Sequence, residues 1–83
     1  MPVRRAIPCK IAPGMFSSER IIWFRIGSLD HSYFVEAESV KDSGDGSGWV
    51  LVDLLRDGAD SIVVVPDAAR TRIGVRQSDL VGV

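Results

Sequence analysis

The stretch ERIIWFRI at residues 19–26 decides the fold class of this chain. It is dense in β-branched and aromatic residues and is followed by Gly27, a composition that favours a strand over a helix. The chain is expected to turn at residues 27–31 and to return as a second strand at residues 32–37. Three further strands are predicted at residues 49–55, 61–65 and 72–76. The expected fold class is therefore all-β.

The segments between these strands carry the signals of turns. Residues 41–48 are polar and glycine-rich and predict a mobile loop, and the Asp57-Gly58 pair is typical of a short hairpin turn. Residues 67–70 fit a single helical turn that begins at the Asp67 side chain. A short helix over residues 49–56 is the alternative to a strand there, but its apolar residues show no period of 3.6.

The length of 83 residues is enough for one hydrophobic core and hence for one domain. Residues 1–18 hold three of the four prolines, which predicts an N-terminal arm with one short extended piece at residues 7–12. The domain itself is expected to span residues 19–83. Valine and isoleucine number 18, against three glutamates, two lysines and one glutamine, a balance that again favours strands.

Charge and cysteine usage exclude several classes of protein. Ten basic and eleven acidic side chains nearly cancel, which is unlike a disordered chain or a dedicated nucleic-acid binder. Cys9 and His31 are each the single residue of their type, so the chain offers neither an internal disulfide nor the four ligands of a structural zinc site. We expect no metal and no cofactor. The lone thiol, and the lack of an apolar segment suited to export or membrane spanning, predict a cytoplasmic protein.

The order of the expected elements resembles that of the Src-homology-3-like small β-barrels. Over residues 19–76 it comprises a hairpin, a glycine-rich loop, a strand opened by Gly48-Trp49, a tight turn, a strand that stops at Pro66, one helical turn and a last strand. The resemblance implies a small five-stranded antiparallel barrel with one short helical turn. It does not extend to peptide binding, because the aromatic segment that lines the peptide groove of that family is absent.

Several strands are apolar on both faces, which one small barrel does not need. One face of each such strand can fill the core, and the other predicts an interface with a second copy of the chain or with another protein. The interface residues predicted in this way are Ile21, Trp23, Trp49, Leu51 and Leu55. The alternative is that the arm, through Ile7, Ile11 and Phe16, covers this face within one chain.

Arginines form a second candidate site. Arg70, Arg72 and Arg76 would share one face of a strand, and Arg4 and Arg5 could extend the row from the arm. The row predicts weak, salt-sensitive anion or nucleic-acid binding, and its alternative is an ordinary solvated face that pairs with neighbouring carboxylates.

Catalytic motifs are not evident in the sequence. The glycine-rich loop fits neither a calcium loop nor a phosphate loop, and the neighbours of His31 alternate in direction along an extended chain, so they cannot form a catalytic relay with it. Function is therefore expected to be that of a self-associating binding or adaptor module, for which another protein or a small molecule is an alternative partner. An enzyme whose site forms only between subunits is the alternative class, with Arg25, Ser32, Tyr33 or Gln77 as contributors.

Overall fold

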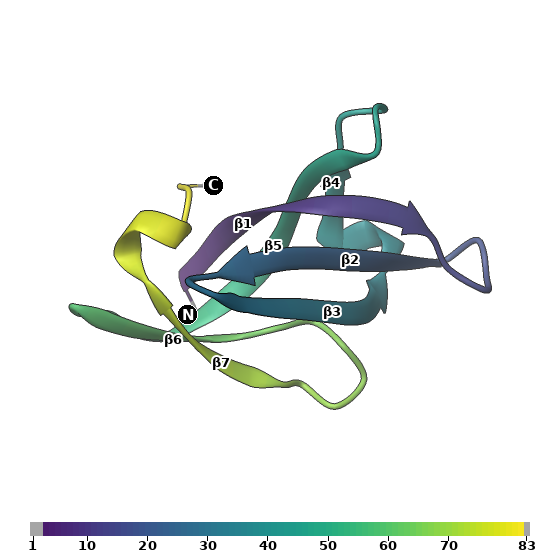
Figure 1. Ribbon diagram of the computed structural model, residues 1–83. Helices are drawn as coiled ribbons and strands as arrows, with labels where there is room; N and C mark the ends of the chain where they lie inside the picture. The colour runs from purple at the N-terminus through teal and green to yellow at the C-terminus, as the bar shows by residue number, and fades with distance from the viewer. Residues whose placement is uncertain (1–2, 83) are drawn as a thin grey trace.

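The computed structural model describes residues 3–82, which form one curled antiparallel sheet (Figure 1). The order of strands across the sheet is β3-β2-β1-β5-β6-β7, and the short strand β4 pairs with β5. Two three-residue 3-10 turns, η1 and η2, are the helical elements of this part of the chain. The elements are β1 (Val3–Pro13), β2 (Glu19–Ile26), β3 (Leu29–Glu36), η1 (Ala37–Ser39), β4 (Val40–Asp42), β5 (Ser47–Arg56), β6 (Asp60–Val64), β7 (Arg72–Arg76) and η2 (Gln77–Asp79).

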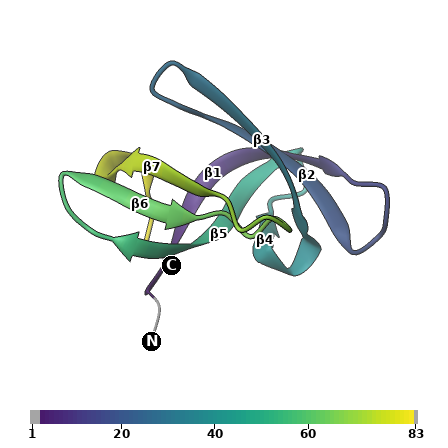
Figure 2. The same cartoon turned by 90° about the horizontal axis from the view of Figure 1, so that it is seen from below.

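The all-β prediction is confirmed, but the prediction of a closed five-stranded barrel is wrong. The sheet has seven strands within the described residues and curls into an open half-barrel (Figure 2). The main difference is β1, because the segment expected to be an arm is an eleven-residue strand between β2 and β5. The first two residues of that arm and the last residue of the expected domain lie outside the described residues.

Pro8 in β1 is compatible with a strand because it stands where no backbone N–H is needed for pairing, which the sequence prediction did not anticipate. Ile11 donates its N–H to Gly46 on the β5 side, whereas Ala6 donates to Val81 on the opposite edge. Since N–H groups alternate along a strand, Pro8 falls on the same edge as Ala6. Pairing of β1 with β2 begins only at Lys10, so the missing N–H of Pro8 lies beyond the end of that ladder.

The connections differ from expectation in two places. The β2–β3 hairpin turns through two residues, with Gly27 at a φ of 62°, so β3 begins earlier than predicted. The helical turn expected at residues 67–70 is a single hydrogen-bonded turn, in which Arg70 donates its N–H to the Asp67 carbonyl. The carboxylate of Asp67 instead accepts bonds from the N–H and hydroxyl of Thr71. Residues 49–56 lie in β5, which excludes the helical alternative.

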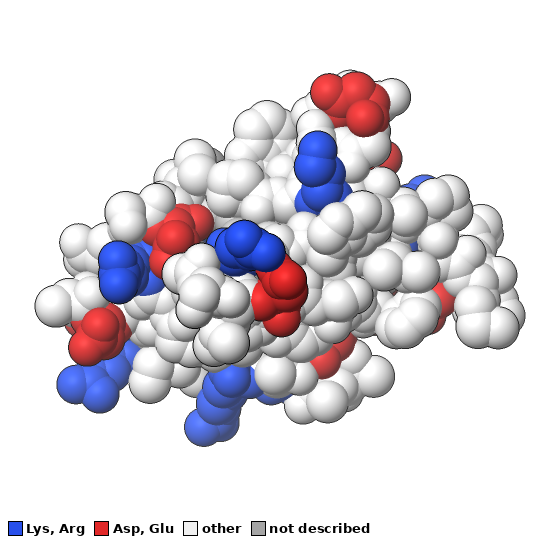
Figure 3. Space-filling view, in the orientation of Figure 1, with Lys and Arg blue, Asp and Glu red and all other residues white. Residues whose placement is uncertain are grey.

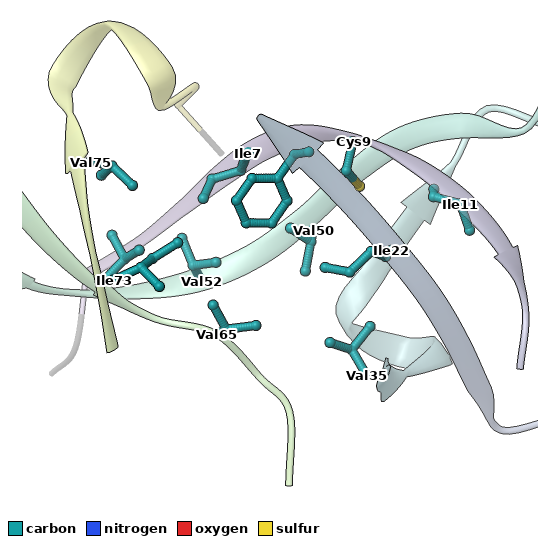
Figure 4. Packing of buried hydrophobic residues seen from close by; sticks show 12 residues of the cluster. Ile7, Cys9, Ile11, Ile22, Val35, Val50, Val52, Val65, Ile73 and Val75 are labelled. Carbon is teal, nitrogen blue, oxygen red and sulfur yellow. The ribbon is translucent and has the colours of Figure 1, made fainter. Parts of the chain in front are cut away.

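The concave side of the sheet holds the hydrophobic core (Figure 4). Ile7, Ile22, Val50 and Val52 are buried there, because alternate residues of each strand point to the same side. Two isolated bridges, Ala6↔Val81 and Val35↔Asp67, tie outlying segments to the sheet.

Cys9 belongs to this core, and its burial has a consequence for stability at high pH. Burial raises the pKa of the thiol from 9.0 to about 11, and the nearby Asp42 carboxylate adds to the rise. An unfolded chain releases this proton near pH 9.0, whereas the folded chain retains it to a higher pH. Burial of the neutral thiol therefore contributes to the stability of the folded state, and this contribution is lost as the pH rises from 9 to 11.

We predict that the free energy of unfolding of the wild-type chain falls more steeply between pH 9 and pH 11 than that of a Cys9→Ala variant, because only the wild type carries the shifted thiol. Denaturant titrations at a series of pH values measure both slopes. Parallel slopes for the two proteins would contradict a raised thiol pKa.

Gly48 lies where three strands run side by side, paired with Cys9 of β1 and Asp42 of β4. A Cβ at this position would overlap the carbonyl oxygen of Lys41 and come within 2.8 Å of Ile11 Cδ1. The close approach of β4 to β5 therefore requires glycine here.

A Gly48→Ala variant should lose about 1–3 kcal/mol of unfolding free energy, because the added methyl must displace the β4 backbone. Gly74→Ala is the matched control: its added Cβ meets nothing within 4 Å, and its stability should be unchanged or slightly higher. Urea denaturation midpoints compare the two. Equal losses of stability in the two variants would show that the contact with β4 is not the reason why position 48 requires glycine.

Candidate functional site

The outer, convex face of the sheet brings the two tryptophans of the chain together across β1. Residues 7, 9 and 11 of β1 are buried, so Pro8 and Lys10 point outward. The strand registers place Trp23 of β2 opposite Lys10 and Trp49 of β5 opposite Pro8. Both tryptophans therefore lie on one face, one on each side of the central strand.

A shallow groove of about 520 Å³ lies between these two side chains. Trp23 is 43% exposed and Trp49 is 39% exposed, so both rings present a large apolar surface to solvent. The described residues that line the groove include two cations and no carboxylate; they are Pro8, Cys9, Lys10, Trp23, Phe24, Arg25, Ser43, Ser47, Gly48 and Trp49. We call this site the two-tryptophan groove.

The remaining predicted interface residues divide between two places. Ile21 and Leu51 are partly buried, and alternation along their strands puts them on the same face as the tryptophans. Leu55 is exposed at the far end of β5, at the irregularity where β5 and β6 shift register, and does not line the groove. Phe34, which was not predicted as part of the interface, pairs with Ile21 and is 53% exposed.

Within the described residues the N-terminal segment does not cover this face, contrary to the alternative prediction. Ile7 and Ile11 point into the core from β1, and Phe16 is exposed in the β1–β2 loop. Alternation along β2 and β3 also turns Ile21 and Phe34 outward, although Phe34 lines a second hollow and not the two-tryptophan groove. The outward-facing surface of β3, β2, β1 and β5 thus carries Phe34, Ile21 and the two tryptophans. We call this surface the outer apolar face.

The predicted arginine row is not brought together. Arg4 and Arg70 both approach the Asp53 carboxylate, at 3.6 Å and 3.4 Å, so one acid offsets part of their charge. Arg72 and Arg76 project from β7 as expected from their spacing. Arg5 follows Arg4 directly and hence points to the opposite face of β1.

A second hollow, also of about 520 Å³, is lined by Arg4 and Arg70, by five acidic residues, and by apolar residues that include Phe16, Phe34 and Leu51. Its carboxylates come from Glu19, Glu36, Glu38, Asp53 and Asp67. Because acids outnumber cations around it, this hollow disfavours an anionic ligand.

The polar residues considered for an enzyme site do not form one cluster within one chain: Arg25 and Ser32 lie on the outer face of the β2–β3 hairpin, Tyr33 packs against the core, and Gln77 lies in η2. Arg25 forms an ion pair with Asp30 at 2.8 Å, and this contact holds the pKa of Asp30 below its usual value. Gln77, the first residue of η2, donates to the Asp57 carboxylate at 3.0 Å, and Asp57 directly follows β5. Ser32 lies opposite Trp23 on the outer face, whereas its chain neighbours His31 and Tyr33 point to the inner face.

His31 lies in β3 and not in the predicted turn. Its Nδ1 is 2.9 Å from the Tyr33 hydroxyl oxygen, and its ring stacks on Phe24 with centroids 5.3 Å apart. Burial, together with the charge of Asp67, raises the pKa of Tyr33. These contacts give His31 and Tyr33 a packing role on the concave side of the hairpin. Across residues 3–82, no cluster of three or more His, Cys, Asp or Glu residues is arranged to hold a metal ion.

The described part of the chain has no helix with the length and hydropathy required to cross a membrane. Comparison of the chain with protein-family models, with curated proteins and with solved structures found no match. The candidate site consequently rests on its own geometry, namely two half-exposed tryptophans that flank an apolar groove on the convex face of the sheet.

Proposed function

We propose that this chain is a small binding module that associates with a second copy of itself through the outer apolar face. The observation that carries the proposal is the pair of half-exposed tryptophans that the strand registers hold on one face. Tryptophan is enriched at the centres of protein interfaces, where a large rigid ring gains much contact area at a small entropic cost.

The exposed apolar area supports an interface of this kind. Trp23, Trp49 and Phe34 are 43%, 39% and 53% exposed. Because aromatic side chains are large, these exposed fractions together leave on the order of 300 Å² of apolar surface in water. That value falls in the range of the largest patches on monomeric proteins, which are commonly functional.

Charge also permits a second copy to approach. The formal net charge is −1, so long-range repulsion between copies is small. On the side of the molecule that Figure 3 shows, acidic and basic side chains are interspersed among uncharged surface instead of gathering in one single-sign patch.

Two narrower proposals accompany this function. We infer a relationship of the half-barrel to the Src-homology-3-like small barrels, supported by the glycine-rich loop, the Gly48-Trp49 strand opening and the stop of β6 before Pro66. We also propose a cytoplasmic location, supported by the free, buried thiol of Cys9.

Replacement of Trp23 or Trp49 by alanine should weaken self-association by at least about tenfold, because each truncation removes a central aromatic contact. Sedimentation equilibrium over micromolar to millimolar protein measures the dissociation constant. Met15→Ala is the matched control, since Met15 is 82% exposed in the β1–β2 loop and lines neither the two-tryptophan groove nor the hollow that contains Phe34. Circular dichroism establishes that each variant is folded.

A wild-type chain that sediments at 9.0 kDa throughout this range would contradict self-association altogether. Unchanged association in both tryptophan variants would show that copies meet through another surface.

A further inference from the structure

Two hollows lie on the outer side of the sheet, and their charges are opposite. The two-tryptophan groove is lined, among the described residues, by the cations Lys10 and Arg25 and by no carboxylate. The second hollow is lined by five carboxylates and by two arginines, Arg4 and Arg70, which both approach Asp53. A surface with one cationic and one acidic hollow complements the same surface of a second copy when their positions are exchanged.

Phe34 is an exposed aromatic side chain at the acidic hollow. Glu36 lies two residues further along β3 and hence on the same face, and the strand register places Glu19 of β2 opposite Glu36. Glu36 is exposed and forms no ion pair within residues 3–82. This end of the outer apolar face therefore presents an aromatic ring beside free negative charge.

The two-tryptophan groove presents the converse chemistry. Its walls are aromatic, and the exposed side chain of Lys10 projects from β1 between them. Lys10 forms no ion pair within the described part of the chain, although the Asp45 carboxylate feels its charge. Arg25 adds a second cation, whose charge it shares with Asp30 at 2.8 Å. The groove therefore suits an apolar ring that carries a carboxylate beside it.

We propose that two copies of this chain meet about a twofold axis so that Phe34 of each copy enters the two-tryptophan groove of the other. This arrangement rests on the proposed self-association through the outer apolar face, and it specifies which part of one face meets which part of the second. Each Glu36 then lies against Lys10 of the second copy. Because a twofold contact is reciprocal, one dimer contains this contact twice.

The spacing of the two features allows both contacts to form in one interface. Strands β3 and β1 flank β2, so Phe34 and the groove lie two strand spacings apart across the sheet, roughly 10 Å. A twofold axis that crosses the face between them, near Ile21 and Trp23 of β2, exchanges their positions.

A twofold contact in which like parts of the two faces meet is less favourable in charge and in shape. It would bring the Lys10 side chains of both copies together at one place and the Glu36 side chains together at another, and like charges placed against each other oppose association. It would also set the tryptophans of two convex faces against each other and leave each groove without a side chain to fill it.

The exchanged contact also uses the polar surface that a dimer of this size needs. The exposed aromatic side chains supply on the order of 300 Å², whereas a standard interface buries roughly 800 Å² per partner. The remaining area has to come from the residues around them, which include Glu19, Glu36, Lys10, Arg25 and Ser32. Burial of these groups is tolerated when acids of one copy meet cations of the second, because paired charges are not left without a partner.

Charge reversal tests the contact between Glu36 and Lys10. Lys10→Glu and Glu36→Lys should each raise the dissociation constant at least about fivefold at low salt, because every dimer then holds two repulsive pairs. The double variant that combines both changes should return to within about twofold of the wild-type value, since it restores both pairs with their signs exchanged. Sedimentation equilibrium measures all three constants.

Arg72→Glu is the matched control for Lys10→Glu. It makes the same change in formal charge at an exposed position of β7 that lines neither hollow, so its dissociation constant should equal that of the wild type. Circular dichroism establishes that each variant is folded.

The outcomes separate this arrangement from self-association as such. If both single variants associate as tightly as the wild type while Trp23→Ala and Trp49→Ala weaken association, the outer apolar face stands and the exchanged contact is overturned. A double variant that remains as weak as the single variants would likewise overturn the contact between Glu36 and Lys10. A wild-type chain that is monomeric throughout overturns both proposals.

The salt dependence of the wild-type chain gives a second test that needs no variant. Because the exchanged contact joins opposite charges, its dissociation constant should rise at least about threefold as sodium chloride increases from about 20 mM to about 300 mM. Contact between like parts of the two faces predicts tighter association over the same range. A dissociation constant that falls or stays constant would overturn the exchanged contact even if the charge variants failed to fold.

Discussion

The antiparallel pairing of β1 with β5 is the interaction on which the rest of this structure depends. It runs from Val3↔Leu54 to Lys10↔Ser47 and joins the two halves of the sheet. The β2–β3 hairpin attaches to one edge of this pair, and β6 and β7 attach to the other. Pro8 then limits how far β2 can follow β1, because a ladder that extended past Lys10 would require an N–H that proline lacks.

The same pairing creates the outer apolar face. Because β1 lies between β2 and β5, the registers on its two sides bring Trp23 and Trp49 onto one surface, although they lie far apart in the sequence. The core needs only the opposite sides of these strands, where Ile22 and Val50 are fully buried. The tryptophans lie outside this core, and about two-fifths of the surface of each remains available to a partner.

Strand composition was sufficient to predict the all-β class and the strands that contain Trp23 and Trp49, since residue type and alternation are local properties. It was insufficient for β1, whose prolines indicate an arm until the direction of each missing N–H is known. The pairing of residues across strands could not be predicted either, and Phe34 is assigned to the outer apolar face only through its register with Ile21. Arg70 left the predicted row because it adopts a φ of 54° in a turn, and an alternating pattern carries no signal for that.

Tryptophan fluorescence on dilution is the most direct measurement of the central idea, that copies of this chain meet through the face that carries both of its tryptophans. Every tryptophan of the chain lies on that face, so the emission reports on no other surface. Association predicts that the emission maximum moves to longer wavelength as the protein is diluted, over the same concentrations at which its sedimented mass falls. An emission maximum that stays at long wavelength from millimolar to nanomolar protein would contradict it.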